Sequence, residues 1–351
     1  MSEHSILPPS SAARRVACPG SREMESLYPR EEGDAAKEGT AAHEEAAECL
    51  RTGKDSNNSY IQMYVDFVRH LMRSSKRTVG FDIEKKVDIS YIHPQCWGTV
   101  DAIVVEPNRV HIIDFKYGFK HVDVFENWQL IEYSAGIPEV REVDYISFHI
   151  VQPRCFNGIP IDTWSIPLDC LMPYWAQLQR VEAVAMEPNA PQRVSSACYN
   201  CKARHACSTF QNAVLNQIDA MRYNLPNDLS NEELGQELRV LHHAQELIEA
   251  RISGLEEEAL CKLKAGERVP NYEIGQVQSR ERWAKDSSEI DILASLFNVD
   301  LRKPPEFITP KQAIKAGIPA EVIREYSETP VGAYKLVATD PQKLRRIFNG
   351  K

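Results

Sequence analysis

Two aspartates and a lysine lie close together in the sequence and could share one side of a β-sheet. Asp101 ends a Gly-Thr-Val-Asp run, and Asp114 and Lys116 belong to an Ile-Ile-Asp-Phe-Lys run. Side chains alternate between the faces of a strand, so Asp114 and Lys116 should point one way and Ile113 and Phe115 into the core. Paired carboxylates hold Mg²⁺ or Mn²⁺, which activates a bound water that a lysine can orient or deprotonate. The alternative is a pair of strand-end charges balanced by Lys116.

A histidine and a glutamine–tyrosine pair could complete such a site. His43 follows a Gly-Thr-Ala-Ala run on an expected helix, while Gln129 and Tyr133 stand four residues apart on another. Residues at this spacing share a helix face, from which both could hydrogen-bond a phosphate or a metal-bound water. Taken alone, His43 would more often be an ordinary packed or surface histidine, and Gln129 and Tyr133 part of an ordinary helix surface. Glu84, on the expected strand before Asp101, is a weaker candidate for the same acidic cluster.

Three cysteines form a second candidate site. Cys198, Cys201 and Cys207 lie within ten residues, and Cys18, 180 residues before the first of them, is the best fourth ligand. The N-terminus lacks a basic-then-apolar signal pattern, so we expect a cytoplasmic protein whose thiols bind metal instead of forming disulfides. Thiolates suit zinc or an iron–sulfur cluster. A zinc site using His205, or free thiols, are the alternatives.

The elements that must position these residues follow from hydrophobic periodicity. The predicted order is two helices, three strands, a helix, two strands and a helix, which favours an α/β fold with a mixed sheet between helices. The second and third strands form a hairpin broken at Pro107-Asn108. The expected ranges are helices at 35–52, 59–74, 123–136 and 168–186, and strands at 79–89, 97–105, 109–116, 144–151 and 160–166.

A long helix is expected over residues 225–268, followed by a small α/β or helical tail over 269–351. The helix carries apolar residues alternately four and three apart, a heptad pattern with one polar break. The seam either packs on its own protein or joins two copies through residues 230–262. Its positions are Leu234, Leu238, Leu241, Gln245, Ile248, Ile252, Leu255 and Ala259.

Composition restricts the function further. The 351 residues include 43% hydrophobic and 26% charged residues, ordinary values that argue against a fibre or a wholly disordered chain. No apolar run is long enough to span a membrane. A net charge of −9 means that nucleic-acid binding would depend on local basic patches. Candidates for such a patch flank the cysteines: Arg14, Arg15, Arg22, Arg193, Tyr199, Lys202, Arg204 and His205.

The acidic motifs together resemble the PD-(D/E)xK nuclease superfamily in its RecB-like branch. The runs GTxxH, GTVD, IIDFK and QxxxY occur in that order, and the resemblance covers roughly residues 10–210, within an expected nuclease domain of residues 1–212. It implies a restriction-endonuclease-like core with His43, Asp101, Asp114 and the Phe115 carbonyl as ligands of Mg²⁺ or Mn²⁺. It also implies Lys116 as the catalytic lysine, with Gln129 and Tyr133 as an accessory motif.

One cysteine before these motifs and three after them resemble the iron–sulfur RecB-like nucleases. These include the AddB subunit, the CRISPR-adaptation nucleases, exonuclease V and phage- or prophage-encoded proteins. The resemblance implies a [4Fe-4S] cluster on Cys18, Cys198, Cys201 and Cys207, with zinc as the competing occupant. It implies a metal-dependent deoxyribonuclease that acts as an exonuclease on DNA ends or single strands. The implied role is in phage replication, recombination or repair, with a recombination or helicase partner. The alternatives are an RNA nuclease or a non-enzymatic DNA-binding protein that keeps the fold.

Overall fold

The computed structural model describes residues 5–29, 33–74, 78–155, 159–220, 229–278, 282–285, 287–303, 306–307, 309–315, 317–328 and 331–338. The chain divides into two compact units, Met1–Gly254 and Leu255–Lys351, and each is described by itself. Of the predicted C-terminal ranges, residues 225–228, 279–281, 286, 304–305, 308, 316, 329–330 and 339–351 lie outside the described residues. In the described part of the chain, no helix combines the length and apolarity needed to cross a membrane.

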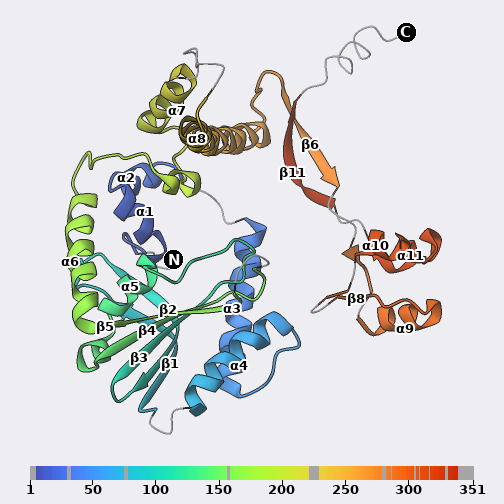
Figure 1. Cartoon of the computed structure of the whole chain (residues 1–351), viewed down its shortest axis with the longest axis horizontal. Helices are drawn as coiled ribbons and strands as arrows, with labels where there is room; N and C mark the ends of the chain where they lie inside the picture. The colour runs from blue at the N-terminus through green and yellow to red at the C-terminus, as the bar shows by residue number, and fades with distance from the viewer. Residues whose placement is uncertain are drawn as a thin grey trace. The chain divides into compact units, whose positions relative to one another are not determined.

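A five-stranded mixed sheet forms the centre of the first unit (Figure 1). Its order is β1-β2-β3-β4-β5, and neighbours are antiparallel except for the parallel pair β3–β4. A parallel pair requires a crossover, which here contains a helix. The prediction of an α/β fold with a mixed sheet is confirmed, including the β2–β3 hairpin. The strands are β1 (Gly80–Asp88), β2 (Trp97–Glu106), β3 (Arg109–Phe115), β4 (Tyr145–Val151) and β5 (Ile161–Pro167).

Helices cover both faces of this sheet (Figure 1). Helices α3 (Asp34–Thr52) and α4 (Ser59–Ser74) pack against Ile113 and Phe115 on one face. The core of the other face includes residues of α5 (Trp128–Ala135), of the 3-10 helix η2 (Pro138–Glu142) and of α6 (Leu168–Ala185). The expected inward direction of Ile113 and Phe115 is therefore observed. The two core layers hold β3, and with it Asp114, in place.

The N-terminal segment is tied to helices α5 and α6 by a buried ion network. It comprises η1 (Pro9–Ser11), α1 (Ala12–Ala17) and α2 (Ser21–Ser26). Arg15 on α1 is 1% exposed; its Nε lies 2.6 Å from Glu182 on α6 and its Nη2 lies 3.1 Å from Glu132 on α5. A buried charge is tolerated only when it is paired in this way. The network therefore places Cys18, which caps α1, next to the segment after α6.

The last part of the first unit contains η3 (Ser196–Asn200), α7 (Ser208–Ala220) and the start of α8 (Asn231–Lys264). The predicted long helix exists, but its buried face is not the predicted seam, although the seam residue Ile248 packs against the same cluster. The buried residues of α8 are Ala244, Leu247, Ala250 and Gly254, and Leu247 and Ala250 pack with Phe210 and Val214 of α7. The large seam residues Leu234, Leu238, Leu241, Ile252 and Leu255 are exposed.

The second unit combines short strands and helices around a small core. Strands β6 and β11 pair antiparallel, as do β7 with β10 and β8 with β9. Its core comes mainly from the helices, with Ile290, Leu293, Ala313 and Ile323 among the buried residues. The elements are β6 (Tyr272–Gln278), β7 (Arg282–Trp283), α9 (Ser287–Phe297), β8 (Arg302–Lys303), β9 (Glu306–Phe307), α10 (Pro310–Lys315), α11 (Ala320–Tyr326), β10 (Ser327–Glu328) and β11 (Val331–Ala338).

Candidate metal and catalytic site

The first candidate site lies where the β2–β3 ladder ends. Ala102 pairs with Ile113, so Asp101 and Asp114 occupy the next facing positions of the hairpin. The Phe115 amide donates to Asp101 Oδ2 at 2.7 Å, and His43 Nδ1 on α3 lies 3.3 Å from Asp101 Oδ1. The structure thus brings His43, Asp101 and the Phe115 peptide together, as the sequence interpretation required. One oxygen of the Asp101 carboxylate accepts from a backbone amide and the other contacts an imidazole, so the carboxylate is held in one orientation.

Glu84 joins this group, although the sequence interpretation gave it less weight. Ligand atoms of His43, Glu84 and Asp101 all lie within 4.8 Å of one another. Burial, and then the charge of Asp101, raise the pKa of Glu84 to about 7. A carboxyl whose ionised form is disfavoured in this way gains most when a cation arrives. The signal that could have found Glu84 is the β1–β2 register, which no motif spacing encodes.

Asp114 faces a different set of partners. Lys116 Nζ lies 3.0 Å from Asp114 Oδ2 and donates to Gln129 Oε1 at 3.0 Å, while Gln129 Nε2 donates to Asp114 Oδ1 at 3.0 Å. Burial raises the pKa of Asp114 in spite of Lys116. Burial alone would lower the pKa of Lys116, but the Asp114 carboxylate raises it above its ordinary value. Lys116 is therefore a fixed, protonated donor beside the His43, Glu84 and Asp101 group.

Helix α5 supplies the accessory residues through local geometry. The Asn127 side chain caps the helix by accepting from the Gln129 and Leu130 amides, which starts the helix at the right point. Gln129 Nε2 lies 3.4 Å from the Tyr133 hydroxyl. A Cβ at Gly98 would lie 2.7 Å from the Tyr133 ring, so glycine there lets Tyr133 lie directly against β2. The predicted sharing of one helix face by Gln129 and Tyr133 is observed.

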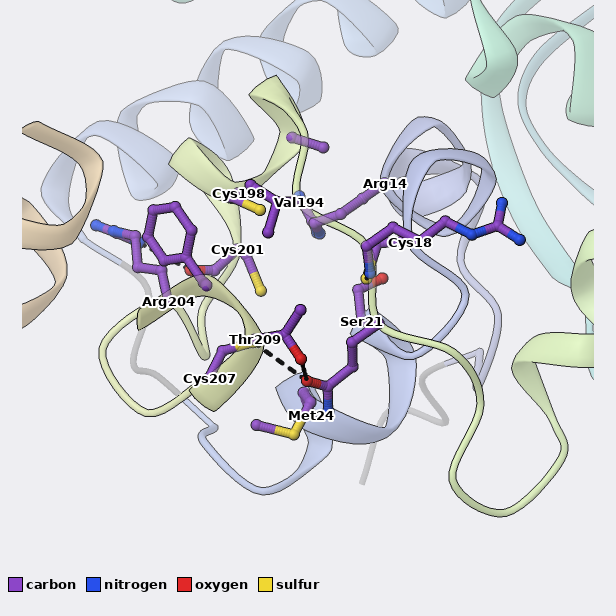
Figure 2. A pocket seen from close by; sticks show the side chains of 14 residues that line it. Arg14, Cys18, Ser21, Met24, Val194, Cys198, Cys201, Arg204, Cys207 and Thr209 are labelled. Atoms are coloured by element: carbon purple, nitrogen blue, oxygen red, sulfur yellow. Dashed lines mark hydrogen bonds between the residues drawn. The ribbon is translucent and has the colours of Figure 1, made fainter. Parts of the chain in front are cut away.

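The second candidate site is a pocket lined by all four predicted cysteines. Figure 2 shows Cys18, Cys198, Cys201 and Cys207 around one hollow, with Met24 and Val194 among its apolar neighbours. The Arg193 amide donates to Cys18 Sγ at 3.3 Å, and the Ser195 amide to Cys198 Sγ at 3.5 Å. Backbone donors of this kind stabilise thiolates, so the donor set fits a bound soft metal or cluster.

Close backbone contact joins the two chain segments that form this pocket. The Gly20 amide donates to the Pro191 carbonyl at 3.0 Å. A Cβ at Gly20 would lie 2.5 Å from the Ala190 carbonyl oxygen, which only glycine avoids. Because Gly20 lacks a Cβ, the N-terminal segment can approach residues 190–192 directly after Cys18.

The alternative zinc ligand, His205, lies apart from the four thiols. It is not among the residues that line the pocket, and its ring packs edge-on against Tyr28. The donors that line the pocket are therefore the four thiols, which suit a soft metal ion or an iron–sulfur cluster.

The predicted basic patch is partly wrong. Arg15 is buried between Glu132 and Glu182, and Arg204 is also buried, so neither adds charge to the surface. Arg14 is paired with Glu25 at 2.9 Å. Tyr199 is exposed and Lys120 stacks over its ring at 5.1 Å, so a cation and an aromatic face remain beside the pocket.

The chain belongs to the protein family described as "Protein of unknown function (DUF2800)", whose pattern matches residues 4–342. The match covers both compact units, so the long helix and the C-terminal elements are part of the family's common architecture. The family description carries no activity, and function must therefore be argued from the two sites.

Proposed function

We propose that the protein is a metal-dependent deoxyribonuclease of the PD-(D/E)xK, RecB-like type. The observation that supports this most is the meeting of His43, Glu84 and Asp101 with the Lys116–Asp114–Gln129 chain at the end of one hairpin. A mixed sheet that presents two aspartates and a lysine from adjacent strands is what the motif resemblance implies. The proposed role is exonucleolytic cleavage of DNA ends or single strands in phage replication, recombination or repair.

In this proposal His43, Glu84 and Asp101 hold Mg²⁺ or Mn²⁺, with the Phe115 carbonyl and Asp114 as further ligands. The bound ion supplies a water of lowered pKa and neutralises phosphate charge. Lys116 keeps its proton because of Asp114, so it acts by donating to the water or to a phosphate oxygen. Gln129 holds the lysine in place, and the Tyr133 hydroxyl lies within reach of Gln129 as an additional donor.

The same proposal places a [4Fe-4S] cluster on Cys18, Cys198, Cys201 and Cys207. Its supports are the four thiols around one pocket and the backbone amide donors to two of them. The cluster's role is structural, because the ligands come from opposite ends of the nuclease-like region. The proposal also includes a cytoplasmic location, which for a phage-encoded protein is the cytoplasm of the host. It further includes a recombination or helicase partner.

The test is cleavage of end-labelled single-stranded DNA with Mn²⁺ by anaerobically purified protein. We expect cleavage by the wild type, none with a chelator, and none for Asp101→Ala. RNA of the same sequence, digested in parallel, separates a deoxyribonuclease from a ribonuclease. A protein that binds the DNA with normal metal and iron content but leaves it intact would instead be the non-enzymatic DNA-binding protein.

A further inference from the structure

One side of helix α8 packs on its own chain, and the opposite side is largely exposed. On one side, Leu247 and Ala250 pack on α7, and Arg251 donates to the backbone carbonyls of Arg204 and His205, at 2.9 Å for the first. A Cβ at Gly254 would lie 2.6 Å from Arg204 Cγ, which shows how closely the helix approaches the cysteine segment. This side of α8 therefore packs against α7 and the cysteine segment of its own chain.

The opposite side carries an apolar seam with little cover. The side chains of Leu234, Leu238, Leu241 and Ile252 are between 40% and 49% exposed. In heptad terms they fall at positions d, a, d and a, whereas Leu247, Ala250 and Gly254 fall at c, f and c. Positions c and f point away from an a/d seam, so most of the seam stays uncovered while the helix packs on its own unit. Ala244 at g is buried as well, and Ile248 at d packs against the α7 cluster. Contiguous apolar surface of this kind marks an association site.

We infer that the seam of α8 binds the α8 seam of a second copy of this chain, as a parallel two-stranded coiled coil. Ile252 at a and leucine at three of the four d positions follow the pattern of a two-stranded coiled coil, whereas Leu238 at a and Ile248 at d depart from it. Glu237 at position g would face His242 at position e of the partner helix, a pair that occurs twice in a symmetric dimer.

Gln245 fixes the direction of the two helices. It lies at position a, in the middle of the seam. In a parallel dimer the two Gln245 amides face each other, and each supplies a donor and an acceptor. In an antiparallel dimer Gln245 would face Ile248 and lose its partner, while Glu237 would face Glu258. A single polar residue at position a is a known device for specifying register and strand number.

The experiment is sedimentation velocity of the full-length protein over a range of concentrations. We expect a reversible dimer for the wild type and, for Leu238→Glu/Ile252→Glu, a dissociation constant raised roughly a hundredfold by burying charge in the seam. Val240→Glu is the matched control, because Val240 is 52% exposed but lies off the seam. Circular dichroism and iron content should be unchanged in all three proteins.

Direction is tested by Leu234→Cys under mild oxidation, compared with the wild type to account for the exposed Cys170 and Cys261. A parallel dimer places the two introduced thiols together and forms a covalent dimer, whereas an antiparallel one faces each of them with Ala259. A wild type that stays monomeric at every concentration would overturn the inference. So would a dimer that survives Leu238→Glu/Ile252→Glu, or one that Leu234→Cys fails to link.

Discussion

Glu84 and Asp101 face each other across the β1–β2 ladder, where the backbone of β1 becomes left-handed. The flanking pairs are Ile83–Ala102 and Lys85–Val100, and Glu84 has φ 49°. Like charges at facing positions destabilise an antiparallel pair by up to about 1 kcal/mol. A left-handed residue other than glycine adds a cost of order 1 kcal/mol or more. Such strain persists at functional sites, and a cation between the two carboxylates would relieve the electrostatic part.

Glu84→Gln should therefore stabilise the metal-free protein and weaken its response to metal. We expect the free energy of unfolding in chelator to rise by about 0.5 kcal/mol, because the like-charge pair is removed. The Mn²⁺-induced rise in melting temperature, which measures binding to the native state, should shrink. Differential scanning calorimetry measures both. Asp82→Asn, on the same strand but paired with Lys85, is the control, and an unchanged Mn²⁺ response for Glu84→Gln would remove Glu84 from the metal site.

Lys116→Met should lose cleavage and also destabilise the protein. Asp114 is 5% exposed, and removal of Lys116 leaves its buried carboxylate with the Gln129 amide but without the opposite charge, at a cost of roughly 3 kcal/mol. The double variant Asp114→Asn/Lys116→Met should regain most of that stability, because neither side chain is then charged, yet remain inactive. Urea unfolding beside a DNA cleavage assay measures the two effects. Cleavage at the wild-type rate by either variant would show that Lys116 is not part of the chemistry.

The proposed cluster predicts that Cys18→Ser contains no iron and loses as much stability as Cys201→Ser. A cross-link between Cys18 and Cys198 closes a loop of 180 residues, and the chain-entropy contribution of a loop that long is about 5 kcal/mol. Visible absorption and iron analysis of anaerobic protein measure occupancy, and thermal unfolding measures stability. Cys170→Ser, at an exposed position outside the pocket, should change neither. A Cys18→Ser protein with full iron content would assign the fourth ligand elsewhere.

The stability of the protein should fall in mild acid because of a buried imidazole. His149 Nε2 lies 2.9 Å from His111 Nδ1, and its Nδ1 lies 2.8 Å from Thr163 Oγ1. Burial, then the charges of His111 and Arg109, lower the pKa of His149 to about 3. In the unfolded chain the His149 imidazole has its ordinary pKa near 6.5. Between about pH 3 and pH 6.5 the unfolded state therefore binds more protons than the native state. Stability contributed by neutral His149 is present above that window and lost as pH falls through it.

The slope of that loss approaches 1.4 kcal/mol per pH unit. His149→Gln should flatten the pH dependence of urea unfolding, measured from about pH 7 to about pH 5. His70→Gln, at an exposed position of α4, should leave the slope as it is. An unchanged slope for His149→Gln would assign the acid sensitivity to other groups.

The parts of this protein that local pattern could predict are those that local chemistry determines. Strand alternation gave the inward direction of Ile113 and Phe115, and helical spacing gave the common face of Gln129 and Tyr133. Glu84 carried little weight because its role depends on which β2 residue it faces, a property of strand register. Arg15 was expected at the surface because its partners Glu132 and Glu182 lie more than 100 residues away. For α8, periodicity identified the helix but could not tell which of its two usable faces its own chain would occupy.

The Arg15–Glu182 contact has a consequence for synthesis of the chain on the ribosome. The two residues are 167 positions apart, and Arg15 emerges first. At ordinary translation speeds, roughly ten to thirty seconds pass before Glu182 has been made. During that interval the N-terminal segment has none of the α6 surface on which it will rest, so α1 cannot dock as it forms. The nascent protein must therefore close its first helix onto its last strand-covering helix after most of the sheet already exists, and a chaperone acting in that interval would meet the segment containing Arg15 and Cys18.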